Sequence, residues 1–207
     1  MDIAPLIVPS MDRREVARVL DEVGEHVRLK TLADLGRREL AILFEAAADN
    51  EPLSLEDFVP ATVPAMTEVI HEGKNSLGLF TRFQKRFCRP AQATNPPELW
   101  GYNEQSMRPF TGPGYFVAYR PTADGPVKGS VVIDYRRLPP DRPAGWPPIM
   151  PNSARLSRFI YNGTVDVMRR VSGHVSIGRA VRDNTKPMDA WFVLVRRDEV
   201  GRAAVPG

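Results

Sequence analysis

The chain of 207 residues has one cysteine, three histidines and no long hydrophobic run. A lone cysteine, Cys88, cannot form an internal disulfide, and such usage suits a reducing compartment, so we expect a cytoplasmic protein. The histidines His26, His71 and His174 stand far apart without the spacing of a metal site, so we expect no metal. A helix needs about 20 consecutive apolar residues to cross a bilayer, and the sequence predicts no membrane span.

An excess of charge of one sign is also lacking. The chain has 28 basic and 25 acidic side chains, interspersed, with a net charge of +3. A nucleic-acid partner is not expected, because neither a long basic tract nor a recognised binding module is present. Acidic Asp2 stands where a signal peptide carries positive charge, which argues against secretion. No phosphate-binding glycine loop precedes a predicted helix, and we expect no cofactor.

The first third of the chain is predicted to be helical. In residues 12–28, apolar side chains recur at intervals of three and four, which places them on one face of a helix. Gly24 is a weak point of this helix. A second helix is expected over residues 32–48, and the apolar residues in 66–70 suggest one or two further helical turns.

After residue 73, short runs rich in Val, Ile, Phe and Tyr alternate with proline and glycine, which is typical of an antiparallel sheet. Residues 138–152 contain six prolines around Trp146 and cannot form a central strand. We expect this segment to cross one end of the sheet, with Trp146 as a plug. Residues 163–171 fit either a strand or a helix, and we favour a strand. The other expected strands are residues 79–87, 115–120, 130–137, 156–161, 174–182 and 190–197.

A series of short motifs follows one another through this second part of the chain. They are TRFQKRF (81–87), WGYN (100–103), VIDYRRLP (132–139), DVMRRV (166–171), HVSIGR (174–179) and WFVLVR (191–196). In the order of these motifs the chain resembles the bacterial GXWXG-type proteins, a family without an established chemistry. The resemblance implies a small lipocalin-like barrel. The Gly-x-Trp-x-Gly motif itself is absent, and the helical first third has no counterpart in that family.

One predicted strand carries an arginine on a face that otherwise consists of Val175, Ile177 and Val181. If this face points into the barrel, Arg179 needs an anionic partner there, because burying an unpaired guanidinium is costly. If the opposite face points inward, its small side chains leave room for a ligand. His174, on that opposite face, would then be a polar contact or a general base.

Arg158 raises the same question in the predicted strand 156–161. For both arginines, the structural alternative is a strand end or an ion pair with Asp134 or Asp166. If a ligand is the partner, the planar guanidinium suits a carboxylate. Aromatic side chains with polar tips suit the lining of such a pocket, although they suit an ordinary core equally. The expected ligand-binding residues are Arg179, Arg158, Tyr115, Tyr119, Tyr135, Trp100, Asn103 and Trp191.

Together these patterns predict an α+β fold in which N-terminal helices (residues 1–75) pack on an antiparallel β-barrel (residues 76–200), followed by a frayed tail (residues 201–207). An antiparallel barrel of about eight strands can enclose one small ligand. The predicted function is therefore the binding of a hydrophobic or amphipathic small molecule, with a carboxylate as one option for its polar end.

Two other functions stay open. The barrel could be an enzyme that performs cofactor-free acid–base chemistry of the isomerase, cyclase or lyase type, with Glu104, His174 and Tyr135 as candidate catalytic residues. Alternatively, the proline-rich segment could bind a partner protein, and the sequence also leaves a homodimer open. An enzyme needs at least two ionisable groups that converge inside a pocket, whereas a carrier needs an apolar cavity with one polar contact. The sequence does not decide between them.

Overall fold

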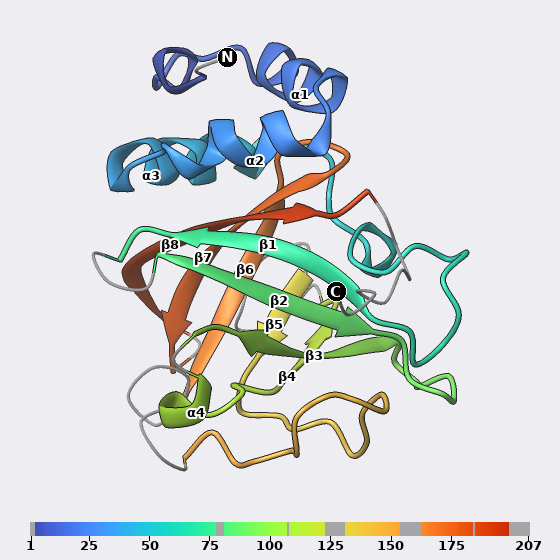
Figure 1. Cartoon of the computed structure of the whole chain (residues 1–207). Helices are drawn as coiled ribbons and strands as arrows, with labels where there is room; N and C mark the ends of the chain where they lie inside the picture. The colour runs from blue at the N-terminus through green and yellow to red at the C-terminus, as the bar shows by residue number, and fades with distance from the viewer. Residues whose placement is uncertain are drawn as a thin grey trace.

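The computed structural model describes residues 3–77, 81–106, 108–122, 131–153, 163–183 and 185–198. Within these residues, eight antiparallel strands form a closed barrel in which each strand pairs with its neighbours in the chain and β8 pairs with β1 (Figure 1). The predicted α+β class with a closed antiparallel barrel is confirmed. The strands are β1 (Val69–Asn75), β2 (Arg82–Cys88), β3 (Glu98–Glu104), β4 (Phe116–Tyr119), β5 (Val131–Asp134), β6 (Thr164–Arg170), β7 (Val175–Arg182) and β8 (Lys186–Arg196).

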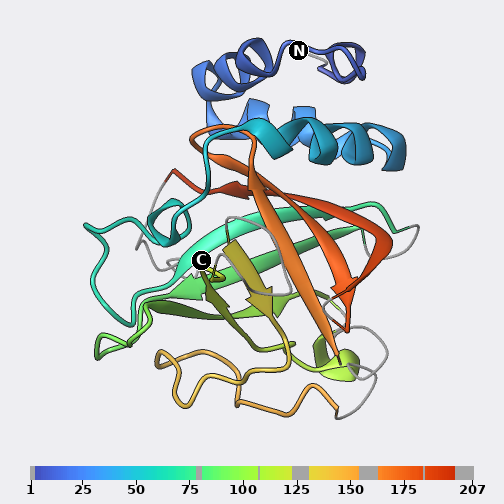
Figure 2. The ribbon, with the colours of Figure 1, turned by 180° about the vertical axis from the view of Figure 1, so that it is seen from behind.

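Three helices lie together on the outside of the barrel: α1 (Arg13–Glu22), α2 (Glu25–Ala33) and α3 (Arg37–Ala46). They lie above β8 in Figure 1, and Figure 2 shows the same arrangement from behind. Their buried leucines pack against outward-facing valines of β6, β7 and β8. A four-residue helix, α4 (Arg108–Thr111), follows β3. None of the described helices is long and apolar enough to cross a membrane. The 3₁₀ turns are η1 (Ala4–Leu6), η2 (Ala47–Asp49) and η3 (Leu55–Asp57).

The expected helix over residues 12–28 is in fact two helices, which meet at Gly24. Buried Arg28 stabilises this junction, because its guanidinium donates to the carbonyl oxygens of Leu20 at 2.8 Å and Val23 at 2.9 Å. These carbonyls lie at the end of α1 and would otherwise lack partners. The expected second helix also begins later than predicted, at Arg37.

Two strands lie where the sequence analysis expects none. β1 occupies Val69–Asn75, which we expected to continue the helical region, so the segment assigned to helices up to residue 75 includes one strand of the barrel. Its alternate residues Val69, His71 and Gly73 are buried, which is the period of a strand. β3 was also missed, because both of its faces are buried and it shows no polar alternation.

The remaining strand predictions agree with the structure where it can be compared. The segment that fitted both a strand and a helix is β6, which confirms the strand interpretation. Strands β2, β4, β5, β7 and β8 overlap the predicted ones. The predicted strand 156–161 and the tail at 201–207 lie outside the described residues.

The barrel wall separates the inside of the barrel from two outer packing layers. Inside, residues such as Phe87, Ile133 and Leu194 form one apolar cluster. Outside, the N-terminal helices cover β6 to β8. On another part of the outer wall, Trp146 of the proline-rich segment packs in a cluster with Trp100, Tyr102 and Tyr115. The prediction that Trp146 plugs one end of the barrel is therefore wrong, because its ring packs on the outer face of β3, 4.9 Å from the Tyr102 ring between centroids.

Three glycines on the inner wall let phenylalanine rings lie directly on the backbone of a neighbouring strand. A Cβ atom on Gly73 would lie 2.5 Å from the ring of Phe83, and one on Gly178 would lie 2.3 Å from the ring of Phe192. Gly101 is related in the same way to Phe116. Real Cβ atoms do not approach other atoms so closely, so a side chain at these positions would displace the rings that line the interior.

The two ends of the barrel differ. At the end beside η3, Leu53, Phe58 and Val59 fill the interior and are almost completely buried. At the opposite end, where β2 begins and β7 ends, the inward-facing side chains of Phe83 and Ala180 are partly exposed. We call this second end the α4 end. The inward-facing side chains are therefore more exposed at the α4 end than at the η3 end.

Candidate functional site

Four polar side chains from different parts of the wall meet inside the barrel. Lys85 comes from β2, Asn103 from β3, Tyr135 from the residue after β5 and Asp166 from β6. Along the chain, Lys85, Tyr135 and Asp166 stand two residues, and Asn103 four residues, from an apolar, inward-facing neighbour, so strand alternation turns all four into the interior. All four are buried.

The Lys85 ammonium is the centre of this cluster. Its Nζ lies 3.1 Å from Oδ2 of Asp166 and 3.0 Å from Oδ1 of Asn103, and it also donates to the hydroxyl of Tyr135. The Tyr135 hydroxyl in turn donates to Oδ2 of Asp166 at 3.0 Å. The Asn103 amide nitrogen donates to the carbonyl oxygen of Gly114 at 3.2 Å, which fixes the orientation of the amide. The three protons of the ammonium thus have three acceptors.

Aromatic rings enclose the same ammonium group. Its Nζ lies 4.9 Å from the ring centroids of Tyr135 and Phe192, 5.3 Å from that of Phe116 and 5.5 Å from that of Phe83. These distances fall within the range of cation–π attraction, which is stronger when the cation is removed from water. Three of these four rings, those of Phe83, Phe116 and Phe192, are the ones that rest on Gly73, Gly101 and Gly178.

Burying the charged groups of this cluster costs free energy. The side chains of Lys85 and Asp166 are 3% and 7% exposed. Burial lowers the pKa of Lys85, and the Asp166 carboxylate opposes this shift by favouring the ammonium form. The desolvation of two charges is commonly as large as their attraction, so a buried ion pair adds little stability compared with apolar side chains of the same size. Buried ionisable groups that converge in this way are characteristic of functional sites.

His71 adds a further ionisable group to the interior. It lies opposite Lys85 in the β1–β2 register, and its Nε2 hydrogen-bonds the carbonyl oxygen of Phe58 at 3.0 Å. Burial lowers the pKa of His71 to about 4, so the ring is neutral at pH 7. Because Nε2 donates to the carbonyl, Nδ1 is the acceptor nitrogen, and it makes no hydrogen bond within the described part of the chain.

Of the predicted ligand-binding residues, Asn103 and Tyr135 face the interior, 3.2 Å apart between the amide nitrogen and the hydroxyl. Arg158 lies outside the described residues. The others lie on the outer wall, where they pack beneath the N-terminal helices or the proline-rich segment: Trp100, Tyr115, Tyr119, Arg179 and Trp191.

Arg179 therefore does not point into the barrel. The small residues of β7, on the opposite face, line the interior instead. The Nε of Arg179 donates to the carbonyl oxygen of Met188 at 3.0 Å, and the Arg179 guanidinium lies 5.0 Å from the centroid of the Trp191 ring. Glu45 of α3 forms an ion pair with it at 3.6 Å. This corrects the expectation that Arg179 meets a ligand in the lumen: its partners are groups of the protein on the outer wall.

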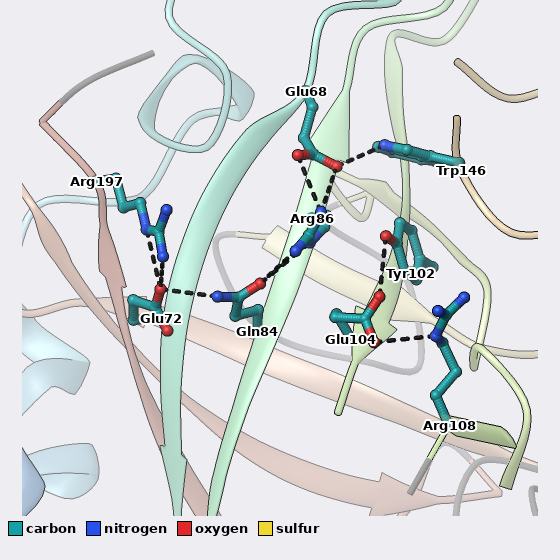
Figure 3. A network of polar contacts seen from close by, with 9 residues as sticks. All are labelled: Glu68, Glu72, Gln84, Arg86, Tyr102, Glu104, Arg108, Trp146 and Arg197. Carbon is teal, nitrogen blue, oxygen red and sulfur yellow. Dashed lines mark hydrogen bonds and ion pairs between the residues drawn. The ribbon is translucent and has the colours of Figure 1, made fainter. Parts of the chain in front are cut away.

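Two of the three candidate catalytic residues lie apart from Tyr135. Glu104 belongs to a polar network on the outer face of β1, β2 and β3, in which Tyr102 donates to it at 3.3 Å and Arg108 pairs with it at 2.9 Å (Figure 3). His174 lies in the turn between β6 and β7, 3.2 Å from the carboxylate of Asp198. The proposed combination of Glu104, His174 and Tyr135 is therefore not assembled in one site.

The central residue of the interior cluster was not predicted. Lys85 stands between Phe83 and Phe87 on the same face of β2, and a lysine at an alternate position between two phenylalanines is the signal that could have revealed it. Asp166 was considered only as a partner for an arginine. Sequence spacing did not bring it together with Lys85, because the two residues meet only when the barrel closes.

The described residues contain no group of three or more His, Cys, Asp or Glu side chains placed to hold a metal ion. Comparison with known proteins adds no relative: no protein-family model, no curated protein and no solved structure matches this chain significantly.

Proposed function

We propose that the protein binds a hydrophobic or amphipathic small molecule inside its barrel, with the polar end of the ligand at the Lys85 cluster. The observation that carries this proposal is the convergence of Lys85, Asn103, Tyr135 and Asp166 within hydrogen-bond distance in a largely apolar interior. A core selected for stability alone would gain more from apolar side chains at these positions. Closed eight-stranded barrels are either filled by side chains or hold one small ligand, and the second, lipocalin-like arrangement is the one proposed here.

The ligand enters at the α4 end in this proposal. There the inward-facing side chains of Phe83 and Ala180 are partly exposed, and Asp166 lies directly opposite Ala180 in the β6–β7 register. A molecule that passes these side chains contacts the ring of Phe192 and then reaches the ion pair. The η3 end cannot serve as an entrance, because buried Phe58 fills it.

The charges of the cluster restrict the chemistry of the polar end. Asp166 already neutralises Lys85, so an uncharged hydroxyl or carbonyl group fits this site best. A carboxylate would meet the Asp166 carboxylate beside the same ammonium, and like charges at this separation in a desolvated site repel strongly. A carboxylate is therefore disfavoured here unless Asp166 is removed.

A competition titration tests this proposal. The neutral fluorescent probe N-phenyl-1-naphthylamine is bound first and then displaced by decanol or by decanoate. Decanol should displace it at least tenfold more effectively, and Asp166→Asn should reverse this preference, because Lys85 is then an uncompensated cation. Ala180→Trp, which narrows the α4 end, should abolish probe binding while the circular dichroism spectrum is kept. Arg179→Met on the outer wall is the matched control and should change neither result. Unaltered binding in Ala180→Trp would overturn the proposal.

The acid–base enzyme is the second candidate function, and one observation favours it. Lys85, Tyr135 and Asp166 are ionisable and lie within hydrogen-bond reach of one another inside the barrel. Mass spectrometry of the small molecules retained by the purified protein separates the two functions. If the protein is an enzyme, Tyr135→Phe should retain a different molecule from the parent, namely substrate instead of product. If it is a binding protein, both should retain the same molecule.

A further inference from the structure

A groove on the outer wall offers a second place for a ligand. It lies between α2 and the outer faces of β1, β2 and β8, where Figure 1 shows α2 running above these strands, and its volume is about 470 Å³. Small-molecule sites usually measure roughly 300–1,000 Å³. We call it the α2 groove. The barrel wall separates it from the Lys85 cluster, because the residues of β8 that line it face outward.

Apolar side chains form the floor of the α2 groove. Leu29 and Leu32 come from α2, and Val193 and Val195 come from β8. Leu32, Val193 and Val195 are buried beneath the helix, whereas Leu29 is only partly buried. The apolar surface that a ligand can reach in the groove therefore comes from Leu29 and Ala33, which are partly buried.

Basic side chains form the rim. Lys30 of α2 and Arg82 of β2 are exposed, and their side chains make no hydrogen bond or ion pair with the described part of the chain. Lys74 of β1 donates to the carbonyl oxygen of Leu35 at 2.5 Å, which uses one of its three protons. These three cations come from separate elements and lie around one cavity.

Acidic side chains compensate this charge only in part. Glu72 also lines the groove, but Arg197 and Gln84 each donate to its Oε1 at 2.9 Å (Figure 3). Its charge is therefore already balanced by Arg197. Among the described residues, Asp34 is the remaining acidic residue of the lining. Three lysine and arginine side chains thus face one unbalanced carboxylate, and the groove carries a positive excess above an apolar floor.

We propose that the α2 groove binds a free, single-chain amphipathic anion, such as an alkyl carboxylate. The chain of the ligand lies against Leu29 and Ala33, above the buried valines of β8, and its anionic head meets Arg82 and Lys30. The planar guanidinium of Arg82 matches a carboxylate with two parallel hydrogen bonds. This site complements the interior one, which disfavours a negative charge, so one protein distinguishes a neutral ligand from an anionic one by where each binds.

Isothermal titration calorimetry with decanoate, below the concentration at which it forms micelles, tests this inference. The parent should bind one decanoate, and Arg82→Glu should weaken binding at least tenfold. Arg38→Glu is the matched control, because Arg38 is an exposed arginine on α3 outside the groove, and it should leave the affinity unchanged. Ala33→Trp, which fills the groove from the partly buried last residue of α2, should abolish binding.

Three results would overturn the inference. Equal weakening by Arg82→Glu and Arg38→Glu would show a non-specific effect of net charge. Loss of decanoate binding in Ala180→Trp, but not in Ala33→Trp, would place the anion in the barrel. Binding to anionic phospholipid vesicles without binding to decanoate would identify the groove as a membrane-contact surface instead. The interior proposal is tested independently, since displacement of its neutral probe should be unaffected by Ala33→Trp.

Discussion

Removing the two charges of the interior cluster, first one at a time and then together, tests whether the cluster stabilises the fold. In Lys85→Met, the Asp166 carboxylate, which is 7% exposed, keeps the Tyr135 hydroxyl as its one donor among the described residues. In Asp166→Asn, the ammonium keeps its aromatic rings and two neutral acceptors but loses its counter-ion. Breaking a buried pair from one side typically costs about 3–5 kcal/mol, because the other charge is left uncompensated. We expect each single variant to lose about 3 kcal/mol or more.

The double variant Lys85→Met/Asp166→Asn should behave differently. Methionine replaces the lysine stem among the same four rings, which suit its sulfur, and asparagine can still accept from Tyr135. No buried charge then remains at the cluster, so the free energy of unfolding should return to within about 1 kcal/mol of the parent value.

Urea unfolding followed by tryptophan fluorescence measures these differences, provided that the slope of the free energy against urea is the same in all four proteins. Recovery in the double variant, together with loss of probe binding, is the expected outcome. If the double variant is instead as unstable as the two single effects added together, the cluster stabilises the core, and the reasoning that assigns it to ligand binding is refuted.

Four further predictions concern other parts of the chain. Because burial lowers the pKa of His71 from 6.5 to about 4, the unfolded chain binds a proton over that range which the folded chain does not, so stability should fall by about 3 kcal/mol from pH 6.5 to pH 4; His71→Leu should flatten this part of the urea-unfolding profile. Burial also raises the pKa of Cys88 to about 12, so iodoacetamide should modify this thiol only as urea unfolds the protein, and rapid labelling of the folded protein would be inconsistent with its position. Gly101→Ala places a Cβ 2.4 Å from a backbone carbonyl oxygen and should cost about 1–3 kcal/mol, whereas Gly24→Ala, with no atom within 4 Å of the new Cβ, should change stability by less than about 0.5 kcal/mol; equal effects would contradict the close packing at the wall. Arg179→Met should change the free energy of unfolding by less than about 1 kcal/mol, since its acidic partners are exposed, and a larger loss in urea unfolding would show that its pairing on the outer wall is structural.

The fold was predictable to the extent that hydrophobic periods identify it. The class, the helices before the barrel and most strands follow from the change of period near residue 73. β1 was missed because His71 and Glu72 interrupt a run that looks like a helical turn, and only pairing with β2 and β8 makes the segment a strand. Gly24 was identified as a weak point, but the break itself depends on the tertiary contacts of Arg28.

The candidate site was less predictable than the fold. Asn103 and Tyr135 were identified as polar residues of a lining, and both face the interior. Which face of β7 points inward could not be decided from the sequence, because an arginine packed under a helix and one in a lumen occupy identical strand positions. The packing of the N-terminal helices over the outer face of β7 and Trp191 determines which face points inward. Lys85 and Asp166 meet only through closure of the barrel, a relation that no local pattern contains.

Native mass spectrometry of the protein mixed with decanol tests the central claim most directly. The account predicts a complex of one protein with one decanol molecule for the parent and its loss in Lys85→Met/Asp166→Asn, although that variant stays folded. Arg179→Met should retain the complex at the parent level. Equal complex formation by the parent and the double variant would contradict the claim that the Lys85 cluster holds the polar end of a ligand inside the barrel.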